Sequence, residues 1–309
     1  MNTERIILAG GSGFLGRALA GELVAQGREV IVLTRQPSSQ RDRVRQVQWD
    51  GRTVGPWGEL LDGARAVVNL TGRSVNCRHT PENRREILQS RVKSTVAIGE
   101  AIRRCAKPPP VWVQASSLAI YGDTGERWCD ESAPPGQDYL AQTCVEWEKA
   151  LAVAPTPATR KLAVRIGIVL ARDEGALKVL AKMVRWGFGG SAGNGKQYVS
   201  WLHLADMNRI FLAAIERDDL EGAFNAAAPN PVTNADFMRE LRRTLHRPWS
   251  PSALEWAVRM GSLFLKTEPR LALEGRRCSP RRLLKTNFDF KFPFLREALN
   301  DLYEKEPLA

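Results

Sequence analysis

The chain has 309 residues, enough for one large domain or two fused ones, and its 43% hydrophobic and 26% charged content is ordinary for a soluble globular protein. Its apolar runs are too short for a transmembrane helix, and glycines follow the first of them at once, which argues against a secretory signal. Five cysteines and three histidines lack the spacing of a disulfide framework or a zinc site. We therefore expect a cytoplasmic protein with free thiols, no bound metal and no membrane partner.

The net charge of +11 is compatible with two kinds of ligand. One is a nucleic acid, and the other is an anionic small molecule bound on an arginine-rich surface. The basic residues are scattered, as in the segment 276–282, and no basic helix is interleaved with aromatic residues. We therefore expect a small-molecule substrate, with an anionic one as an option, and no nucleic-acid partner.

Strand and helix patterns alternate through the first half of the chain. Residues 5–10 are a short apolar run typical of a buried strand, and residues 14–27 have helical spacing that ends at Gly27, a candidate helix C-cap. The same reasoning predicts strands at 29–35, 64–72, 111–117 and 161–171, and helices at 81–106 and 144–154. This alternation predicts an α/β fold with a Rossmann-type, doubly wound parallel sheet.

The pattern changes after residue 175. The expected elements are a helix at 176–187, a glycine-rich loop at 187–197, a short strand and helix at 198–216, a strand at 222–228 and a largely helical tail. The glycine-rich loop suits either a lid over an anionic ligand or a plain surface loop. We expect two packed parts: an NADP-binding Rossmann domain, 1–175 with 199–228 returning to it, and a smaller, mainly helical substrate-binding lobe, 176–198 and 229–309.

A glycine-rich turn joins the first strand to the first helix. Gly10, Gly13 and Gly16 have the spacing G-x-x-G-x-x-G. Such glycines permit a tight turn, the close approach of a pyrophosphate and contact between helix and strand. The N-terminus of the helix then directs its N–H groups at phosphate. The strand–loop–helix context predicts a dinucleotide site formed by Gly10, Gly11, Ser12, Gly13, Phe14, Leu15 and Gly16.

The end of the second strand selects the dinucleotide. An NAD enzyme usually has an acidic residue about twenty positions after the glycines, where it binds the ribose 2′-hydroxyl. Here Thr34 and Arg35 hold that place. An arginine pairs with a 2′-phosphate, whereas an acid would repel it. The sequence therefore predicts NADP(H) as the cofactor.

Several segments, in their order, resemble one known family. They are LAGGSGFLGRALA, VIVLTRQP, VVNLTG, EILQSRVKST, YGDTGE, CVEWEKA, VRIGIVL and FNAAAPNPVTNADF, and the similarity runs almost end to end. The chain resembles an atypical extended short-chain dehydrogenase/reductase of the YfcH-like, or sugar-nucleotide epimerase family, subgroup. Its tail, LALEGRRCSPRRLLKTNFDFKFP, resembles the C-terminal domain of that subgroup, which has no assigned function.

The resemblance implies further cofactor contacts. These come from a strand end, from the helix after it and from a position beside the nicotinamide: Asn69, Leu70, Thr71, Gly72, Glu86, Arg91 and Val169. The resemblance also makes a homodimer an option, because two long helices of this sheet type often form a dimer in extended family members.

The catalytic residues depart from the family pattern. Short-chain dehydrogenases use a Ser or Thr together with Tyr-x-x-x-Lys, in which the lysine lowers the pKa of the tyrosine. Ser117 and Tyr139 match the serine and the tyrosine, but residue 143 is Thr143 rather than a lysine. Tyr121, which follows the serine strand, is a rival acid or base.

Two functions therefore stay open. One is an oxidoreductase or epimerase that acts on a small or nucleotide-linked carbonyl or alcohol. The other is a weakly active or inactive NADP(H)-binding protein that senses redox state or supports a partner as a scaffold. The missing lysine favours the second function, whereas the cofactor residues fit either.

Overall fold

The structure is a computed structural model that describes residues 4–38, 44–264 and 266–304. Its centre is a parallel sheet of seven strands in the order β11-β7-β5-β4-β1-β2-β3. They are β1 (Arg5–Ala9), β2 (Glu29–Thr34), β3 (Val44–Gln48), β4 (Ala66–Asn69), β5 (Val111–Ser117), β7 (Arg160–Ile166) and β11 (Gly222–Ala226). The strand order reverses between β1 and β4, which is where doubly wound sheets bind their ligands. The expected Rossmann-type fold is confirmed.

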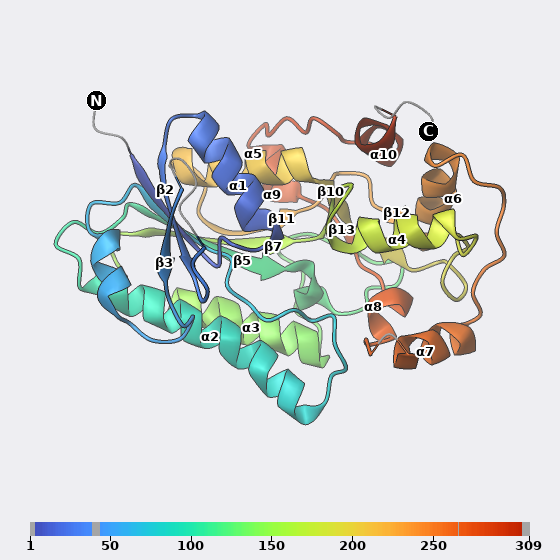
Figure 1. Ribbon diagram of the computed structural model, residues 1–309, viewed down its shortest axis with the longest axis horizontal. Helices are drawn as coiled ribbons and strands as arrows, with labels where there is room; N and C mark the ends of the chain where they lie inside the picture. Colours follow the sequence, from blue (N-terminus) through green and yellow to red (C-terminus); the bar gives the residue numbers. More distant parts are fainter. Residues whose placement is uncertain (1–3, 39–43, 265, 305–309) are drawn as a thin grey trace.

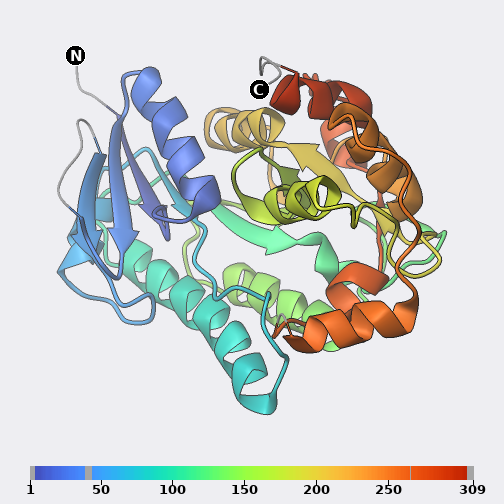
Figure 2. The same cartoon turned by 45° about the vertical axis from the view of Figure 1, so that its right-hand side comes forward.

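Helices cover both faces of this sheet, as Figures 1 and 2 show. On one face α1 (Phe14–Ala25) packs against α5 (Leu204–Glu216), and the other face carries α2 (Pro81–Arg103), α3 (Tyr139–Ala152) and the short helix η1 (Pro56–Leu61). The Thr80 side chain accepts a hydrogen bond from an N–H in the first turn of α2, and Asp138 does the same for α3. These two caps fix where the helices beside the site begin.

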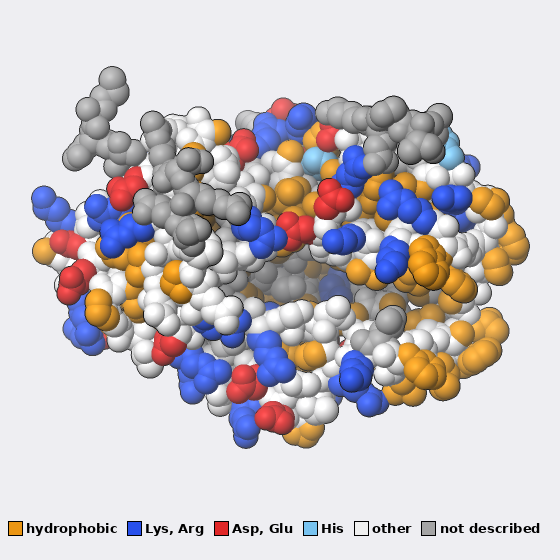
Figure 3. Space-filling view, viewed as in Figure 1, with side chains coloured by type: hydrophobic (Ala, Val, Ile, Leu, Met, Phe, Trp, Pro, Cys, Tyr) orange, Lys and Arg blue, Asp and Glu red, His pale blue; other side chains and the backbone are white. Residues whose placement is uncertain are grey.

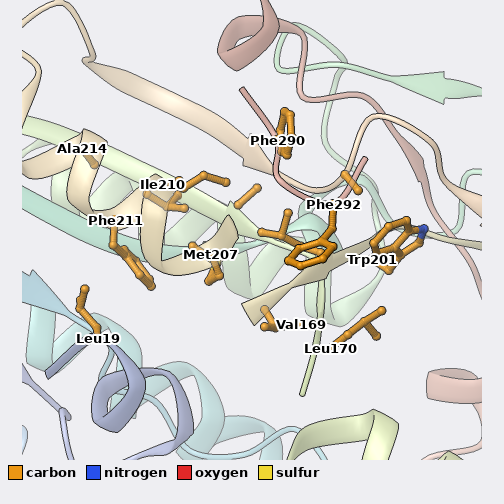
Figure 4. Packing of buried hydrophobic residues seen from close by; sticks show 14 of the residues in the cluster. Leu19, Val169, Leu170, Trp201, Met207, Ile210, Phe211, Ala214, Phe290 and Phe292 are labelled. Carbon is orange, nitrogen blue, oxygen red and sulfur yellow. The ribbon is translucent and has the colours of Figure 1, made fainter. Parts of the chain in front are cut away.

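The central strands are buried on both faces, and alternate residues therefore belong to different hydrophobic clusters. Ile6 belongs to the cluster on the α1–α5 side, and Ile7 to the cluster on the α2 side. Figure 4 shows the first cluster, in which Phe211 of α5 points towards Leu19 of α1. This double burial explains why the strands are continuous apolar runs in the sequence.

Most of the remaining elements gather at one end of the molecule, on the right in Figure 1. Three pairs of short strands, β8–β10, β9–β12 and β6–β13, connect them. The elements are η2 (Leu118–Tyr121), β6 (Trp128–Cys129), β8 (Ile168–Leu170), α4 (Gly175–Arg185), β9 (Tyr198–Val199), β10 (Trp201–His203), β12 (Val232–Thr233), α6 (Asn234–Thr244), α7 (Glu255–Phe264), α8 (Arg270–Leu273), β13 (Arg277–Cys278), α9 (Arg281–Lys285) and α10 (Leu295–Tyr303). Within the described ranges, no helix is long and apolar enough to cross a membrane, and no group of three or more His, Cys, Asp or Glu residues is placed to hold a metal ion.

Buried polar groups attach the C-terminal segment to the Rossmann part. Asp206 of α5 is fully buried and accepts hydrogen bonds from the N–H groups of Lys291 and Phe292 at 2.8 and 2.9 Å. Ser200 Oγ donates to the carbonyl oxygen of Arg276 at 2.7 Å. Because Phe292 also joins the hydrophobic cluster beneath α5, the tail shares a core with the sheet.

Three differences from the expected pattern concern the main sheet and α3. The sequence does not predict β3, because this edge strand, VRQVQ, carries polar residues and is only partly buried. The single strand expected at 161–171 is two strands in different sheets, β7 and β8, separated by Gly167, where a Cβ would lie 2.6 Å from the Ser200 carbonyl oxygen. Helix α3 begins at Tyr139 instead of residue 144, because Asp138 caps it there.

Candidate cofactor-binding and catalytic site

The glycine loop between β1 and α1 is tightly packed at Gly10 and Gly16 and open at Gly13. A Cβ on Gly16 would lie 2.4 Å from the Gly11 Cα, and a Cβ on Gly10, whose φ is +71°, would lie 3.0 Å from Thr71. A Cβ on Gly13 would meet only a carbonyl oxygen at 3.5 Å. Gly13 is also the N-cap of α1 and offers no side chain to the first-turn N–H groups. The loop is therefore an open cradle that a pyrophosphate fits.

Polar side chains connect this loop to the end of β2. Thr34 Oγ1 donates a hydrogen bond to Ser12 Oγ at 3.0 Å, and Arg35 follows as an exposed residue just beyond the strand. Arg17, in the first turn of α1, donates to the Ser12 carbonyl oxygen at 2.5 Å and forms an ion pair with Glu174. The exposed guanidinium of Arg35 thus lies at the strand end where the sequence pattern predicts the 2′-phosphate.

Buried amide groups hold the segment that follows β4. Asn69 is fully buried, its Nδ2 donates to Gln114 Oε1 at 3.0 Å, and its Oδ1 accepts from the Thr71 N–H at 3.0 Å. The Leu70 N–H donates to the carbonyl oxygen at the end of β1 at 2.8 Å. These bonds keep Leu70 and Thr71 against the glycine loop.

Glu86 and Val169 occupy opposite surroundings. Glu86 of α2 forms ion pairs with Arg52 and Arg73 at 3.4 and 3.5 Å, so it links the loops that follow β3 and β4. Val169 is buried in β8, where it pairs with Leu202 of β10. The carboxylate of Glu86 is therefore paired with two arginines at the surface, whereas Val169 belongs to the hydrophobic core.

Arg91 of α2 lies beside the loop after β4. Its guanidinium carbon would be 3.2 Å from a Cβ placed on Gly72, and it is 5.0 Å from the ring centre of Trp147. Its Nη1 donates to the carbonyl oxygen of Arg73 at 3.0 Å. Burial lowers the pKa of Arg91, and the nearby Cys144 and Tyr139 oppose that effect. Arg91 is therefore a cation held in a largely buried position near Gly72.

Ser117 and Tyr139 lie at the ends of β5 and α3, and their hydroxyls have different partners. Ser117 Oγ accepts from the Ala119 N–H at 3.1 Å, whereas the Tyr139 hydroxyl donates to the carbonyl oxygen of Arg84 at 2.8 Å. Thr143, in the place of the family lysine, is buried and donates to the Tyr139 carbonyl oxygen at 2.9 Å. The threonine therefore bonds to its own helix and does not replace the lysine.

Two arginines supply positive charge near Tyr139. The Arg84 guanidinium is 5.0 Å from the Tyr139 ring centre, and Arg91 is close enough to favour the ionised phenol. Burial nevertheless raises the pKa of Tyr139 above its ordinary value, while Thr143, Arg91 and Arg84 lower it by less. The phenol therefore stays protonated at neutral pH. This cation pair is a feature that sequence reasoning missed, because Arg84 and Arg91 are distant from Tyr139 along the chain.

The rival tyrosine, Tyr121, belongs to a buried polar network. It is 1% exposed, and its hydroxyl donates to Asn225 Oδ1 and accepts from Arg165 Nη1, both at 2.8 Å. Arg165 also donates to both carboxylate oxygens of Glu148, at 2.9 and 2.8 Å. Burial raises the pKa of Tyr121 to about 12 although Arg165 lowers it. These surroundings favour a structural role for Tyr121, and the signal in the sequence is an arginine within the apolar strand at 161–171.

A hollow lies between the Rossmann helices and the C-terminal elements and is called the cofactor groove below. Figure 3 shows a hollow in the middle of this face, with α1 and α4 above it and α2 and α7 below it in the orientation of Figure 1. Thr267 Oγ1 donates to Asn76 Oδ1, and the His79 N–H donates to Glu268 Oε2 at 3.4 Å. The segment between α7 and α8 therefore contacts the loop after β4, which borders the cofactor groove.

Sequence comparison agrees with this dinucleotide-binding geometry. A profile of the NAD dependent epimerase/dehydratase family matches residues 6–227. The chain belongs to this family. A domain of unknown function, DUF1731, matches residues 255–302 of this family member. The whole chain is 34% identical to epimerase family protein SDR39U1 of Bos taurus, over 96% of this chain and 99% of the bovine protein. It is 31% identical to epimerase family protein YfhF of Bacillus subtilis, over 96% of this chain and 97% of that protein.

Solved structures extend the similarity to the whole fold. Human SDR39U1 (isoform 2) with NADPH has a TM-score of 0.87 at 30% identity, covering 98% of this family member and 100% of that chain. The nucleoside-diphosphate sugar epimerase from Corynebacterium glutamicum has a TM-score of 0.80 at 29% identity, covering 100% and 60%. MoeE5 with UDP-glucuronic acid and NAD, at 19% identity and a TM-score of 0.76, shows the fold alone. The resemblance to extended short-chain dehydrogenases with this C-terminal domain is confirmed.

Proposed function

We propose that the chain binds NADP(H) at the glycine loop and is an oxidoreductase or epimerase for a small or nucleotide-linked carbonyl or alcohol. The bound dinucleotide would supply hydride-transfer chemistry. Gly13 and the first turn of α1 would hold the pyrophosphate, and Arg35 would hold the 2′-phosphate. The open cradle of the loop and the NADPH in human SDR39U1 support this assignment. Residues 176–198 and 229–309 would provide the substrate-binding lobe.

The observation that carries the proposal is the position of Tyr139 at the start of α3, beside Arg84 and near Arg91. The two arginines supply positive charge where the usual pattern has a lysine, although burial outweighs their effect on the pKa of Tyr139. Because burial keeps the phenol protonated, Tyr139 is suited to donate a proton to a substrate oxygen. We therefore propose that carbonyl reduction is the favoured direction, with Ser117 polarising the same oxygen.

A second candidate function rests on a different observation. The Tyr139 hydroxyl is already bonded to the Arg84 carbonyl oxygen, and Thr143 stands in the lysine position. These features fit a weakly active or inactive NADP(H)-binding protein that senses redox state or serves as a scaffold. Incubation with NADPH and a broad carbonyl panel, followed at the absorbance of reduced nicotinamide, separates the two. Tight NADPH binding without turnover on any carbonyl would favour the second candidate.

Tyr139→Phe should lower kcat for carbonyl reduction by at least about 100-fold, because the proton donor is lost. The wild-type rate should stay flat through neutral pH and fall only above the ordinary tyrosine value of 10.0, since the pKa of Tyr139 is raised. Steady-state kinetics over this pH range measure both effects. Tyr303→Phe is the matched control, because the Tyr303 hydroxyl is buried without a hydrogen-bond partner in the part of the chain that the structure describes. A neutral-pH inflection that Tyr139→Phe removes would contradict the donor role.

Arg35→Ala should weaken NADPH binding by roughly 10- to 100-fold and leave NADH binding unchanged, because a charge-assisted contact to the 2′-phosphate is lost. Isothermal titration with each dinucleotide measures the selectivity. Arg45→Ala removes the same charge from an exposed position on the neighbouring strand β3 and serves as the control. Equal losses of NADPH affinity in both variants would show that Arg35 acts only through the overall charge.

A further inference from the structure

A cluster of large apolar side chains projects from the C-terminal end of the molecule. We call it the aromatic edge and define it by Trp186, Phe188, Trp249, Leu254, Trp256 and Phe264, which are each between 61% and 81% exposed. Figure 3 shows hydrophobic side chains gathered at this end, over the C-terminal part of α4 and over α7, with basic side chains beside them. Single exposed apolar residues are ordinary on a protein surface, but a gathered set of this kind marks an interaction site.

Helix α7 exposes its largest apolar side chains to solvent instead of burying them against its own chain. Of its ten residues only the small Ser262 is buried, and Ala257 and Val258 are partly buried, whereas Trp256 and Phe264 are 66% and 81% exposed. A helix that packs on its own core turns its large apolar residues inward. The exposed face of α7 therefore suits an apolar environment outside this chain.

Hydrogen bonds hold the parts of the aromatic edge together. The Gly189 N–H donates to Ser250 Oγ at 3.2 Å, and Ser250 Oγ donates to the Gly187 carbonyl oxygen at 2.7 Å. A Cβ on Gly190 would overlap the Pro251 carbonyl oxygen, so the glycine-rich loop is pressed against the segment that leads into α7. The glycine-rich loop therefore packs against the segment that carries Trp249 and Leu254, and of the two alternatives from its composition, a lid or a plain surface loop, these contacts favour the surface loop.

The sequence around the aromatic edge is strongly basic. Residues 178–196 contain four basic residues and no acidic ones, residues 241–254 contain three and none, and residues 255–266 contain two against one acid. The basic residues are Lys178, Lys182, Arg185, Lys196, Arg242, Arg243, Arg247, Arg259 and Lys266. Arg243 and Arg259 form ion pairs with Glu240 and Glu255, and the other seven leave an excess of positive charge in these segments. An anionic surface would complement them.

We propose that the aromatic edge binds the surface of a membrane that contains anionic lipids, with α7 lying in the interface and the basic residues meeting the headgroups. Tryptophan and phenylalanine enter the headgroup region readily, and basic residues beside them add electrostatic attraction. A bilayer also accepts side chains that project singly, because it needs no preformed pocket for each of them. The expectation of no membrane partner considered only helices that span a membrane.

Two other occupants fit the same surface less well. A second copy of this chain in a twofold dimer would place the same basic segments opposite each other, and their charges would repel. A protein partner would need a separate pocket for each projecting ring and an acidic surface around those pockets. The anionic bilayer satisfies the apolar and the charged features together.

Vesicle flotation with the full chain tests the proposal. The probes are vesicles of phosphatidylcholine alone and vesicles in which phosphatidylserine makes up about a third of the lipid. The wild-type protein should float with the anionic vesicles and bind the neutral ones at least about tenfold more weakly, because several basic residues act near the surface. The variant Trp249→Ser/Trp256→Ser/Phe264→Ser should lose anionic binding.

The matched control is Trp128→Ser/Val153→Ser/Phe294→Ser, which removes three exposed apolar side chains from other elements and should float like the wild type. Circular dichroism melting of both variants checks that they fold. Equal flotation with neutral vesicles, or unchanged flotation of the aromatic-edge variant, would overturn the proposal. Failure of the wild type to float with anionic vesicles would also overturn the proposal and would favour a protein partner on the aromatic edge. Concentration-dependent self-association that the aromatic-edge variant abolishes would instead assign the surface to a second copy.

Discussion

Gly16→Ala is expected to weaken NADPH binding by at least about tenfold. The added Cβ would lie 2.4 Å from the Gly11 Cα, and backbone cannot move aside as a flexible side chain can. The glycine loop or the start of α1 must shift, and the cradle for the pyrophosphate then loses its shape. Isothermal titration calorimetry with NADPH measures the change in affinity, and circular dichroism of the unliganded variant shows that the fold persists.

Gly21→Ala is the control for this substitution, because it lies in the same helix and nothing is within 4 Å of the added Cβ. It should leave NADPH affinity unchanged and stabilise α1 by roughly 0.5–1 kcal/mol. Wild-type affinity in Gly16→Ala would contradict the assignment of the dinucleotide to this loop.

Arg165→Met should lower the free energy of unfolding by about 3–5 kcal/mol, because it leaves the Glu148 carboxylate without its buried partner. The side chains of Arg165 and Glu148 are 11% and 16% exposed, and the closest ion-pair distance is 2.8 Å. Arg165 also donates to Tyr121, so the variant removes one hydrogen bond from the buried phenol. Urea unfolding followed by circular dichroism measures the loss.

The double variant Glu148→Leu/Arg165→Met should be more stable than Arg165→Met, because it removes both charges from the buried site. Arg259→Ala provides the surface comparison, since its ion pair with Glu255 has side chains 62% and 59% exposed. Its effect should stay within about 1 kcal/mol. A loss in the double variant equal to or larger than that in Arg165→Met would show that packing, rather than charge, governs this site.

Local patterns predict most of the Rossmann part. The apolar runs that become β1, β2, β4 and β5 are buried on both sheet faces, which gives them a continuous hydrophobic character. The edge strand β3 is not predicted, because one of its edges faces solvent and its sequence mixes polar and apolar residues. Gly167 separates β7 from β8 where a side chain would meet the carbonyl oxygen of Ser200, a residue that only the tertiary structure brings near.

The surroundings of the candidate catalytic residues are less predictable. The sequence shows that Thr143 stands where the family has a lysine, and no nearby residue in the sequence indicates a cation that replaces this lysine. The structure places Arg84 and Arg91 from α2 beside Tyr139 from α3. That arrangement depends on how the two helices pack against each other, which no spacing along one helix reveals.

The glycine loop illustrates what the sequence alone determined about this protein. Its glycines lie within one strand–loop–helix unit, so local spacing is enough to predict a dinucleotide site, and the contact of Arg35 with a 2′-phosphate stays a prediction. The surroundings of Tyr139, the burial of Tyr121 and the aromatic edge depended on the tertiary structure. Each is built from segments far apart in the chain, and charge, burial and exposure are properties of that assembly rather than of any one segment.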